Sequence, residues 1–241
     1  MRELQRQVLE ANLALARSGL VTLSFGNVSG VDRDAGALVI KPSGVPYAEL
    51  RAEDMVVVAL EDGRTVEGRL RPSIDTPTHR LLYLDLPDIG GVVHTHSPYA
   101  SAWAQAGRPI PCLGTTHADY FRGEVPVSRA LAAVEVAGDY EWETGRVIVE
   151  TLKQSGRTAQ DSPAVLVSSH GPFAWGATPV AAVETAVVLE TVAVTAYRTL
   201  VLNAAVSELT PELLGRHFDR KHGAGAYYGQ SAAGLAGDEK P

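Results

Sequence analysis

The chain has 241 residues, 45% of them hydrophobic and 20% charged, which is enough apolar sequence for one large folded domain or two small ones. This composition is not that of a disordered, collagen-like or coiled-coil protein. With 21 basic and 28 acidic residues the formal net charge is −7, which argues against a nucleic-acid or membrane partner but leaves room for a local anion pocket. The single cysteine, Cys112, excludes an intrachain disulfide framework and a cysteine-rich zinc module, and it favours a cytoplasmic location.

Hydrophobic periodicity predicts the elements of the N-terminal part. Apolar residues at helical spacing indicate a helix over residues 4–15, with Gly19 just beyond its C-terminal end. Four runs rich in strand-forming residues follow, at residues 21–25, 37–40, 55–60 and 65–67. The last two would be joined by a turn at Asp62 and Gly63.

Capping residues and apolar runs predict the remaining elements. Thr76 followed by Pro77 marks a helix start, with Thr76 as its N-cap residue. Strands are expected at residues 91–95 and 164–168. Helices are expected at residues 98–106 and 143–154, the second closing at Gly156. Two further helices would begin at about residue 179 and at residue 211, the last with Thr210 as its cap.

The most apolar stretch, residues 178–202, is interrupted by three charged residues, Glu184, Glu190 and Arg198. It therefore predicts a helix that faces the core and not a membrane span. Helices and strands alternate, and several strands join through short turns, so we expect an α/β fold with a central mixed, mostly antiparallel sheet flanked by helices. The predicted domain spans residues 1–230, with a flexible tail at 231–241 and no secretory leader.

Three histidines lie at the expected ends of strands. His94 and His96 are two residues apart in a strand, so their side chains emerge on the same face and could share a metal ion. His170 follows an apolar run and precedes Gly171 at the mouth of another strand. Three such imidazoles suit zinc or manganese, with coordination positions left for substrate oxygens. From these motifs alone, a hydrogen-bonded histidine pair and a structural His170 are alternatives.

Other polar residues could complete a site. Asp75 lies at the predicted helix start, where it serves either as a ligand or as a plain cap. Residues 24–30 and 41–44 combine glycines with Asn, Ser and Lys, as in loops that hold phosphate, but ordinary turns are the alternative. Neither segment has the glycine spacing of a nucleotide-binding fingerprint.

Six longer motifs together carry a resemblance. They are FGNVS at 25–29, IKPSGV at 40–45, VHTHS at 93–97, GTTHADYF at 114–121, SHGPFAWG at 169–176 and RKHGAGAYYGQ at 220–230. In these motifs the chain resembles the L-ribulose-5-phosphate 4-epimerases, a branch of the class II aldolase superfamily that also contains L-fuculose-phosphate aldolase. The resemblance runs from the N-terminus to Gln230 and implies a class II aldolase-like fold.

The resemblance also implies a set of site residues. A divalent metal, zinc or alternatively manganese, would be bound by His94, His96 and His170, with Asp75 in or beside its shell. Asp119 and Tyr228 would be the two acid/base residues, although a turn aspartate and a packing tyrosine are the ordinary interpretations of each. The substrate and phosphate pocket would comprise Gly26, Asn27, Ser43, Gly44, Ser73 and Ile74, with Lys41 close by.

One position departs from the family pattern. The family usually has Ser-Ser-Asp where this chain has Ser73, Ile74 and Asp75. A hydroxyl that donates to phosphate contributes about 1.5 to 3 kcal/mol, because the acceptor is charged. Ile74 removes that donor, so we expect either weaker phosphate binding or compensation by backbone N–H groups.

The implied activity is the interconversion of L-ribulose 5-phosphate and D-xylulose 5-phosphate at carbon four. That carbon lies β to the carbonyl and its hydrogen is not acidic, so the bond between carbons three and four must break and re-form. Two proton-transfer groups on opposite faces are then required, which Asp119 and Tyr228 would supply. The resemblance further implies a homotetramer with active sites at subunit interfaces, the tyrosine coming from the neighbour, and a role in sugar metabolism such as arabinose catabolism.

Four other functions are compatible with parts of the sequence. An L-fuculose-phosphate type aldolase would release the two fragments, and a related 4-epimerase would act on another pentulose phosphate. A metal-dependent hydrolase also uses a His-x-His pair at a strand end, but it would not need Tyr228. A non-catalytic interaction domain would have no use for three clustered histidines.

Overall fold

One sheet of seven strands runs through the part of the chain that this computed structural model describes, residues 1–223 and 226. The strands are β1 (Asn27–Asp32), β2 (Ala37–Ile40), β3 (Val56–Ala59), β4 (Thr65–Glu67), β5 (Gly91–His94), β6 (Ala164–Leu166) and β7 (Pro172–Gly176). Their order is β4-β3-β2-β1-β5-β7-β6, and all neighbouring pairs are antiparallel. Among the described residues, parallel pairing is limited to an isolated bridge between Val127 and Leu166. The predicted mixed, mostly antiparallel sheet is thus antiparallel along all its strands.

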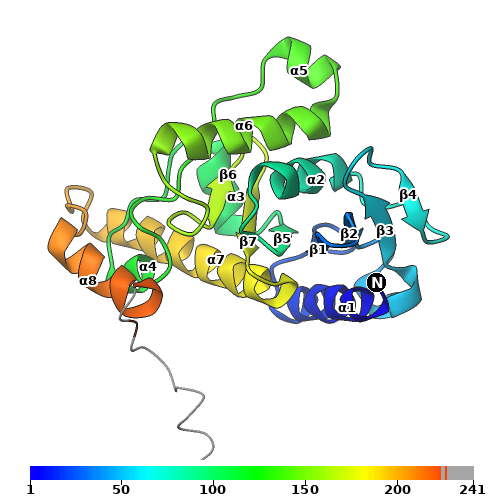
Figure 1. Ribbon diagram of the computed structural model, residues 1–241. Helices are drawn as coiled ribbons and strands as arrows, with labels where there is room; N and C mark the ends of the chain where they lie inside the picture. The colour runs from blue at the N-terminus through cyan, green and yellow to red at the C-terminus, as the bar shows by residue number, and fades with distance from the viewer. Residues whose placement is uncertain (224–225, 227–241) are drawn as a thin grey trace, which may run out of the picture.

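Helices cover both faces of this sheet. They are α1 (Arg2–Arg17), α2 (Thr76–Asp85), α3 (Pro98–Gln105), α4 (Thr115–Ala118), α5 (Ala133–Ala137), α6 (Tyr140–Ser155), α7 (Pro179–Leu202) and α8 (Pro211–His222). Figure 1 shows α1 and α7 on one side of the sheet and α2 and α6 on the other. Two apolar clusters correspond to these two layers, so each sheet face is buried against helices.

Strand alternation decides which face receives the histidines. Val93 packs in the cluster under α1 and α7, whereas Val92 packs in the cluster under α2 and α6. Successive side chains of a strand point to opposite faces, so His94 shares the face of Val92. The imidazole therefore lies on the side where α2 and α6 begin.

Local signals correctly predicted several helix ends, although the short helices α4 and α5 were not predicted. Thr210 caps α8 through its side chain, which accepts a hydrogen bond from the Leu213 N–H, and Gly156 ends α6 in the left-handed conformation at φ +67°. The prediction of Thr76 as a cap is wrong. Asp75 is the N-cap residue of α2, while the Thr76 hydroxyl donates to the Ser73 carbonyl at 2.5 Å. The start of α6 also lies three residues before the predicted position 143, at Tyr140.

The strand predicted at residues 21–25 does not form. This segment turns instead, with Leu23 in the left-handed region at φ +55° and the Phe25 N–H donating to the Thr22 carbonyl. Gly26 follows at φ +75°, where a Cβ atom would lie 2.8 Å from the His94 carbonyl oxygen. Only glycine allows this close approach, and β1 begins at the next residue, Asn27.

Two strands were not predicted. β1 lies in a segment that was interpreted as a loop because of its glycines and polar residues, yet four of its residues are buried. β7 is five residues long and begins at Pro172, which weakens its strand signal. Both strands flank β5 in the sheet, so their identity depends on tertiary pairing.

The long apolar helix α7 packs against β7, β5 and α1, which confirms the prediction of a core-facing helix. By length and composition alone it could cross a membrane, but 50% of its most apolar window is buried inside the protein. A helix in the core of a globular domain can have the same length and apolar composition.

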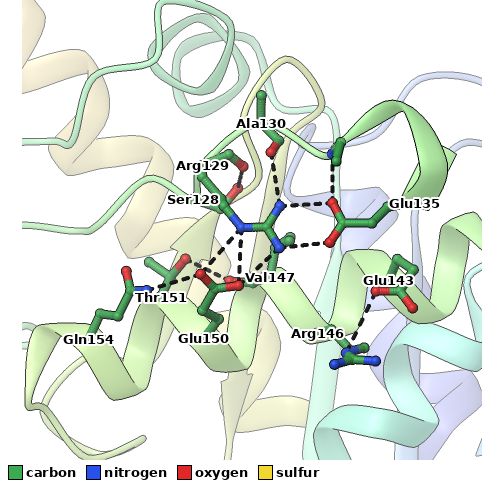
Figure 2. A network of polar contacts seen from close by, with 11 residues as sticks. Ser128, Arg129, Ala130, Glu135, Glu143, Arg146, Val147, Glu150, Thr151 and Gln154 are labelled. Atoms are coloured by element: carbon green, nitrogen blue, oxygen red, sulfur yellow. Dashed lines mark hydrogen bonds and ion pairs between the residues drawn. The ribbon is translucent and has the colours of Figure 1, made fainter.

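A charged network holds α5 beside α6 (Figure 2). The Arg129 guanidinium donates to Glu135 on α5 at 2.7 Å and to Glu150 on α6 at 3.1 Å. The Glu135 carboxylate also accepts from the Ala132 N–H at 2.6 Å. These side chains remain partly exposed to solvent, so the network orients the α5 segment more than it stabilises the fold. Residues 231–241, predicted to be a flexible tail, lie outside the described part of the chain.

Candidate active site

Three imidazoles converge at one end of the central strands. His94 is the last residue of β5, His96 follows two residues later, and His170 lies in the turn between β6 and β7. The Nε2 atoms of His94 and His96 are 3.0 Å apart, and one ring nitrogen from each of the three histidines lies within 4.8 Å of the others. The predicted triad is therefore brought together by segments more than 70 residues apart in the sequence.

The surroundings fix the ring of His94. Its Nδ1–H donates to the Pro172 carbonyl at 3.0 Å, which leaves the lone pair on Nε2, the atom that faces His96. The ring also stacks on Phe173, with centroids 4.1 Å apart. Gly171 allows the two segments to come this close, because a Cβ atom there would lie 2.8 Å from the Thr95 carbonyl oxygen.

The charge states suit a divalent cation. Burial lowers the pKa of His170 to about 4 and also lowers the pKa of His96, so both imidazoles are neutral at pH 7. Burial raises the pKa of Asp75, but His94, His79 and a hydrogen bond from Asn27 outweigh it, and the pKa of the carboxyl is lowered. Three imidazoles beside a carboxylate are a donor set that zinc or manganese accepts.

Asn27 and Ser73 connect the carboxylate to the rest of the site. The Asn27 Nδ2 donates to Asp75 Oδ2 at 2.6 Å and to the Ser73 hydroxyl at 3.0 Å. Among the described residues, Asn27 Oδ1 is a buried acceptor with no hydrogen-bond partner. Buried polar atoms are almost always paired, so this oxygen is suited to accept a bond from a bound ligand.

The triad opens into a cavity of about 460 Å³, a volume typical of small-molecule sites. Every predicted metal and substrate residue lines it: Gly26, Asn27, Lys41, Ser43, Gly44, Ser73, Ile74, Asp75, His94, His96 and His170. Five further residues line it that were not predicted as site residues: Ser24, Phe25, Pro42, Tyr140 and Glu141. Tyr140 and Glu141 were missed because they begin α6, which was expected to start later.

Lys41 supplies a cation to this cavity. Its Nζ donates to the carbonyls of Ser24 at 3.2 Å and Pro42 at 3.3 Å, and lies 4.8 Å from the centroid of the Tyr47 ring. Burial lowers the pKa of Lys41 to about 8, so the ammonium still dominates at neutral pH. Ser43 lies beside it with its N–H bonded to the Arg71 carbonyl, so its hydroxyl is the donor available to a phosphate.

Asp119 lies at the end of α4, away from the residues that line this cavity. Its carboxylate accepts from Arg220 at 2.7 and 2.9 Å and from His217 at 3.0 Å, which joins the end of α4 to α8. Burial raises its pKa, but the bonds from Arg220 and His217 outweigh burial and lower it. Within the described residues, Asp119 does not line the cavity with the imidazoles. Tyr228, the other predicted acid/base residue, is outside the described residues.

The remaining histidines have other partners. His79 is fully buried and lies 2.7 Å from the Ser29 hydroxyl through its Nδ1, in keeping with a structural role. His117 donates from Nε2 to the Gly123 carbonyl at 2.8 Å, close to the Asp119 segment. His222 donates from Nε2 to the Asp119 carbonyl at 2.9 Å.

Comparison with solved structures gives the fold. The chain superposes on an L-fuculose 1-phosphate aldolase with a TM-score of 0.79 and 23% identity, covering 91% of this chain and 96% of that one. It also superposes on YgbL from Klebsiella pneumoniae, described as a putative aldolase/epimerase/decarboxylase, with a TM-score of 0.70 and 26% identity over 89% and 97% of the two chains.

Sequence comparison gives the family. The chain is 54% identical to the L-ribulose-5-phosphate 4-epimerase UlaF of Salmonella paratyphi B, over 95% of this chain and all of that protein. The enzyme of the same name from Salmonella typhi is 53% identical over the same shares. The model of the Class II Aldolase and Adducin N-terminal domain matches residues 6–197. With this match across most of its length, and with the antiparallel sheet described above, the chain belongs to the class II aldolase family.

Proposed function

We propose that this protein is an L-ribulose-5-phosphate 4-epimerase, which interconverts L-ribulose 5-phosphate and D-xylulose 5-phosphate. The observation that carries the proposal is the 54% identity to an enzyme of this name, over 95% of this chain and all of that enzyme. The cavity supports it, because a histidine triad, a lysine and three serines line one volume of about 460 Å³.

Class II aldolases depend on a divalent metal, and we propose zinc, held by His94, His96 and His170 with Asp75 in or beside the shell. When bound, such an ion acts as a Lewis acid on the substrate carbonyl and stabilises negative charge on its oxygen. The chain's own contribution is to keep His96 and His170 neutral by burial and to set the tautomer of His94 through the Pro172 carbonyl.

The lysine and serine side chains of the cavity would hold the phosphate. Lys41 provides a positive charge in a low-dielectric setting, where its attraction to a phosphate is stronger than in water. The hydroxyls of Ser43 and Ser73 are hydrogen-bond donors, and Gly44 leaves space at the rim. Asn27 Oδ1 can accept a bond from a substrate hydroxyl.

Epimerisation requires two proton transfers. A base first removes the proton from the hydroxyl on carbon four, and the electrons of the bond between carbons three and four then move to the three-carbon fragment. The aldehyde fragment, glycolaldehyde phosphate, rotates by about half a turn and the bond re-forms on its other face. An acid on the opposite wall returns a proton to the oxygen on carbon four.

We assign these transfers to Asp119 and Tyr228 of a neighbouring copy in a homotetramer. A shared site is supported by the position of Asp119, which does not line the cavity of its own chain within the described residues. Its bonds to Arg220 and His217 favour the ionised form, which suits a base. A phenol with a pKa near ~10 needs a cationic neighbour to act as a base, and the segment before Tyr228 contains Arg220 and Lys221.

A coupled assay with each pentulose 5-phosphate, together with metal analysis, tests the proposal. We expect reversible conversion of L-ribulose 5-phosphate to D-xylulose 5-phosphate by protein that contains zinc. Release of glycolaldehyde phosphate without the epimer would assign an aldolase of the L-fuculose-phosphate type. Faster turnover of another pentulose phosphate would change the substrate, and ester hydrolysis without epimerisation would assign a hydrolase.

A further inference from the structure

Tyr140 contacts one member of the histidine triad. Its hydroxyl oxygen is 3.4 Å from Nδ1 of His170, and the two rings are nearly parallel, with centroids 6.3 Å apart and an interplanar angle of 28°. Both side chains line the same cavity and both are half-buried. Among the described residues, Tyr140 is thus a tyrosine whose hydroxyl contacts the proposed metal site. It reaches His170 from the start of α6, whereas His170 lies between β6 and β7.

The position of Tyr140 is rigid because the start of α6 is tied to α2. The Thr78 hydroxyl on α2 donates to the Glu141 carbonyl at 2.5 Å, and the Thr144 hydroxyl donates to the carbonyl of Tyr140 at 2.8 Å. One turn further along α6, Gly145 lies so close to α2 that a Cβ atom would be 3.1 Å from Cβ of Leu81. The helix that carries Tyr140 therefore packs directly on the helix that begins after Asp75.

The two possible hydrogen bonds have opposite consequences for the metal site. If the Tyr140 hydroxyl donates to His170 Nδ1, the ring proton is on Nε2 and that nitrogen cannot bind a cation. If His170 Nδ1–H donates to the Tyr140 oxygen, the lone pair is on Nε2 and is available to an ion. His94 shows the second arrangement, since its Nδ1–H donates to the Pro172 carbonyl.

We propose that Tyr140 is a positioning residue, which accepts a hydrogen bond from His170 Nδ1–H and so holds His170 in the tautomer and ring orientation that binds the metal. Ligating histidines are commonly oriented by such partners, and loss of a partner weakens metal binding by about 10 to 100-fold. The assignment rests on the proposed function only for the presence of a metal at the triad.

The direct test is the tautomer of His170 in metal-free protein. Nitrogen-15 shifts of the histidine side chains distinguish a proton on Nδ1 from one on Nε2, and the His170→Asn variant identifies the signal. We expect the Nδ1–H form in the wild type and a loss of that preference in Tyr140→Phe. A wild-type ring protonated on Nε2 would overturn the proposal, and this outcome does not require Tyr140→Phe to fold.

The second measurement is zinc affinity, by competition with a chelator. Tyr140→Phe keeps the ring and removes only the oxygen, so we expect zinc to bind 10 to 100-fold more weakly. Tyr197→Phe is the matched control, because Tyr197 is 52% exposed on α7 and lines another part of the surface, and its affinity should equal that of the wild type. Equal affinity of Tyr140→Phe and wild type would refute the positioning role.

Both measurements are made without substrate. Failure of the epimerase assay would leave the tautomer and the zinc affinity unaffected, so the two proposals fail separately. A Tyr140→Phe protein that loses turnover but keeps the wild-type tautomer and zinc affinity would assign Tyr140 to the substrate, against the proposal.

Discussion

Lys41 is a residue whose chemistry depends on where the fold puts it. It is 2% exposed, at the end of β2, and burial lowers its pKa to about 8. A surface lysine is protonated well beyond that pH, but Lys41 loses its proton within the range in which an enzyme is assayed. Its charge should therefore limit phosphate binding at mildly alkaline pH.

We expect kcat/KM to decrease as the pH rises through about 8, because kcat/KM reports the free enzyme and the ammonium form binds phosphate. The phosphate itself does not explain this, since its second pKa is near ~6. In the Lys41→Met variant the pH dependence near 8 should disappear and KM should rise. Lys153→Met, at a side chain 71% exposed, should keep the wild-type profile.

The same pKa has the opposite effect on stability. Between about 8 and the ordinary lysine pKa, the unfolded chain binds a proton at Lys41 that the folded chain does not. The contribution of Lys41 to the free energy of unfolding therefore rises with pH over this interval.

The kinetic prediction has a clear contrary outcome. A kcat/KM that stays constant up to pH 10 would contradict the assignment of Lys41 to phosphate.

Ile74 is a second residue with a specific consequence. It lines the polar cavity between Ser73 and Asp75 and is 68% exposed, which is unusual for a large apolar side chain. Its exposure means that a smaller polar residue fits there without a cavity or strain.

We predict that Ile74→Ser lowers KM for the sugar phosphate by about tenfold at unchanged kcat, because a hydrogen bond to a charged acceptor contributes roughly 1.5 kcal/mol. Ile74→Val adds no donor and should retain the wild-type KM, so it is the matched control. An unchanged KM in Ile74→Ser would mean that existing donors already satisfy the phosphate.

At the scale of elements, α3 has a cap that comes from another helix. Its N-cap residue, Ser97, makes no capping bond with its side chain. Instead the Glu190 carboxylate on α7 accepts from the N–H groups of Tyr99 at 2.8 Å and Ala100 at 2.9 Å. One of the charges that interrupts the apolar helix therefore satisfies the first turn of the helix that follows the His-x-His segment.

Glu190→Gln should lower the free energy of unfolding by about 1 to 2 kcal/mol, since the amide keeps the shape but offers one acceptor in place of two. Glu184→Gln, on the exposed side of the same helix, should change it by less than about 0.5 kcal/mol. Urea unfolding at a fixed protein concentration measures both. Equal midpoints for the two variants would show that the cap adds nothing to stability.

The elements differ in how well local sequence predicted them. Helices with clear caps, such as α7 after Thr178 and α8 after Thr210, begin where side chains satisfy the first N–H groups. β1 and β7 were missed because their residues look like loops until they pair with β5. The predicted strand at residues 21–25 has strand-forming residues, but Gly26 must turn to pass the His94 carbonyl.

At the scale of the whole molecule, the site is built from segments far apart in the sequence. The cavity combines the loop before β1, the end of β2, the start of α2, the end of β5, the start of α6 and the turn after β6. The bonds of Asp119 instead join α4 to α8. If Asp119 transfers a proton as proposed, a complete site would require a second chain.

Mixing two inactive variants tests the shared site. His96→Asn should lose metal and activity, and Asp119→Asn should keep metal and lose activity. If His96 and Asp119 of different chains form each site, tetramers reassembled from equal amounts should recover about a quarter of wild-type activity, because each partner is intact in half of the pairings. No recovery in proven mixed tetramers would mean that each site lies within one chain.

Sequence alone determined the ligand types, the same-face pair His94 and His96, and the capped helices, which follow from local periodicity and capping residues. Most residues of the cavity were predicted only through the resemblance to the L-ribulose-5-phosphate 4-epimerases, which longer motifs carry. Tertiary structure alone decided that those residues share one cavity and that Tyr140 contacts His170. It also decided that burial lowers the pKa of Lys41, and that Asp119 contacts Arg220 and does not line the cavity within the described residues. These depend on strand pairing and helix packing between distant segments, which no local pattern encodes.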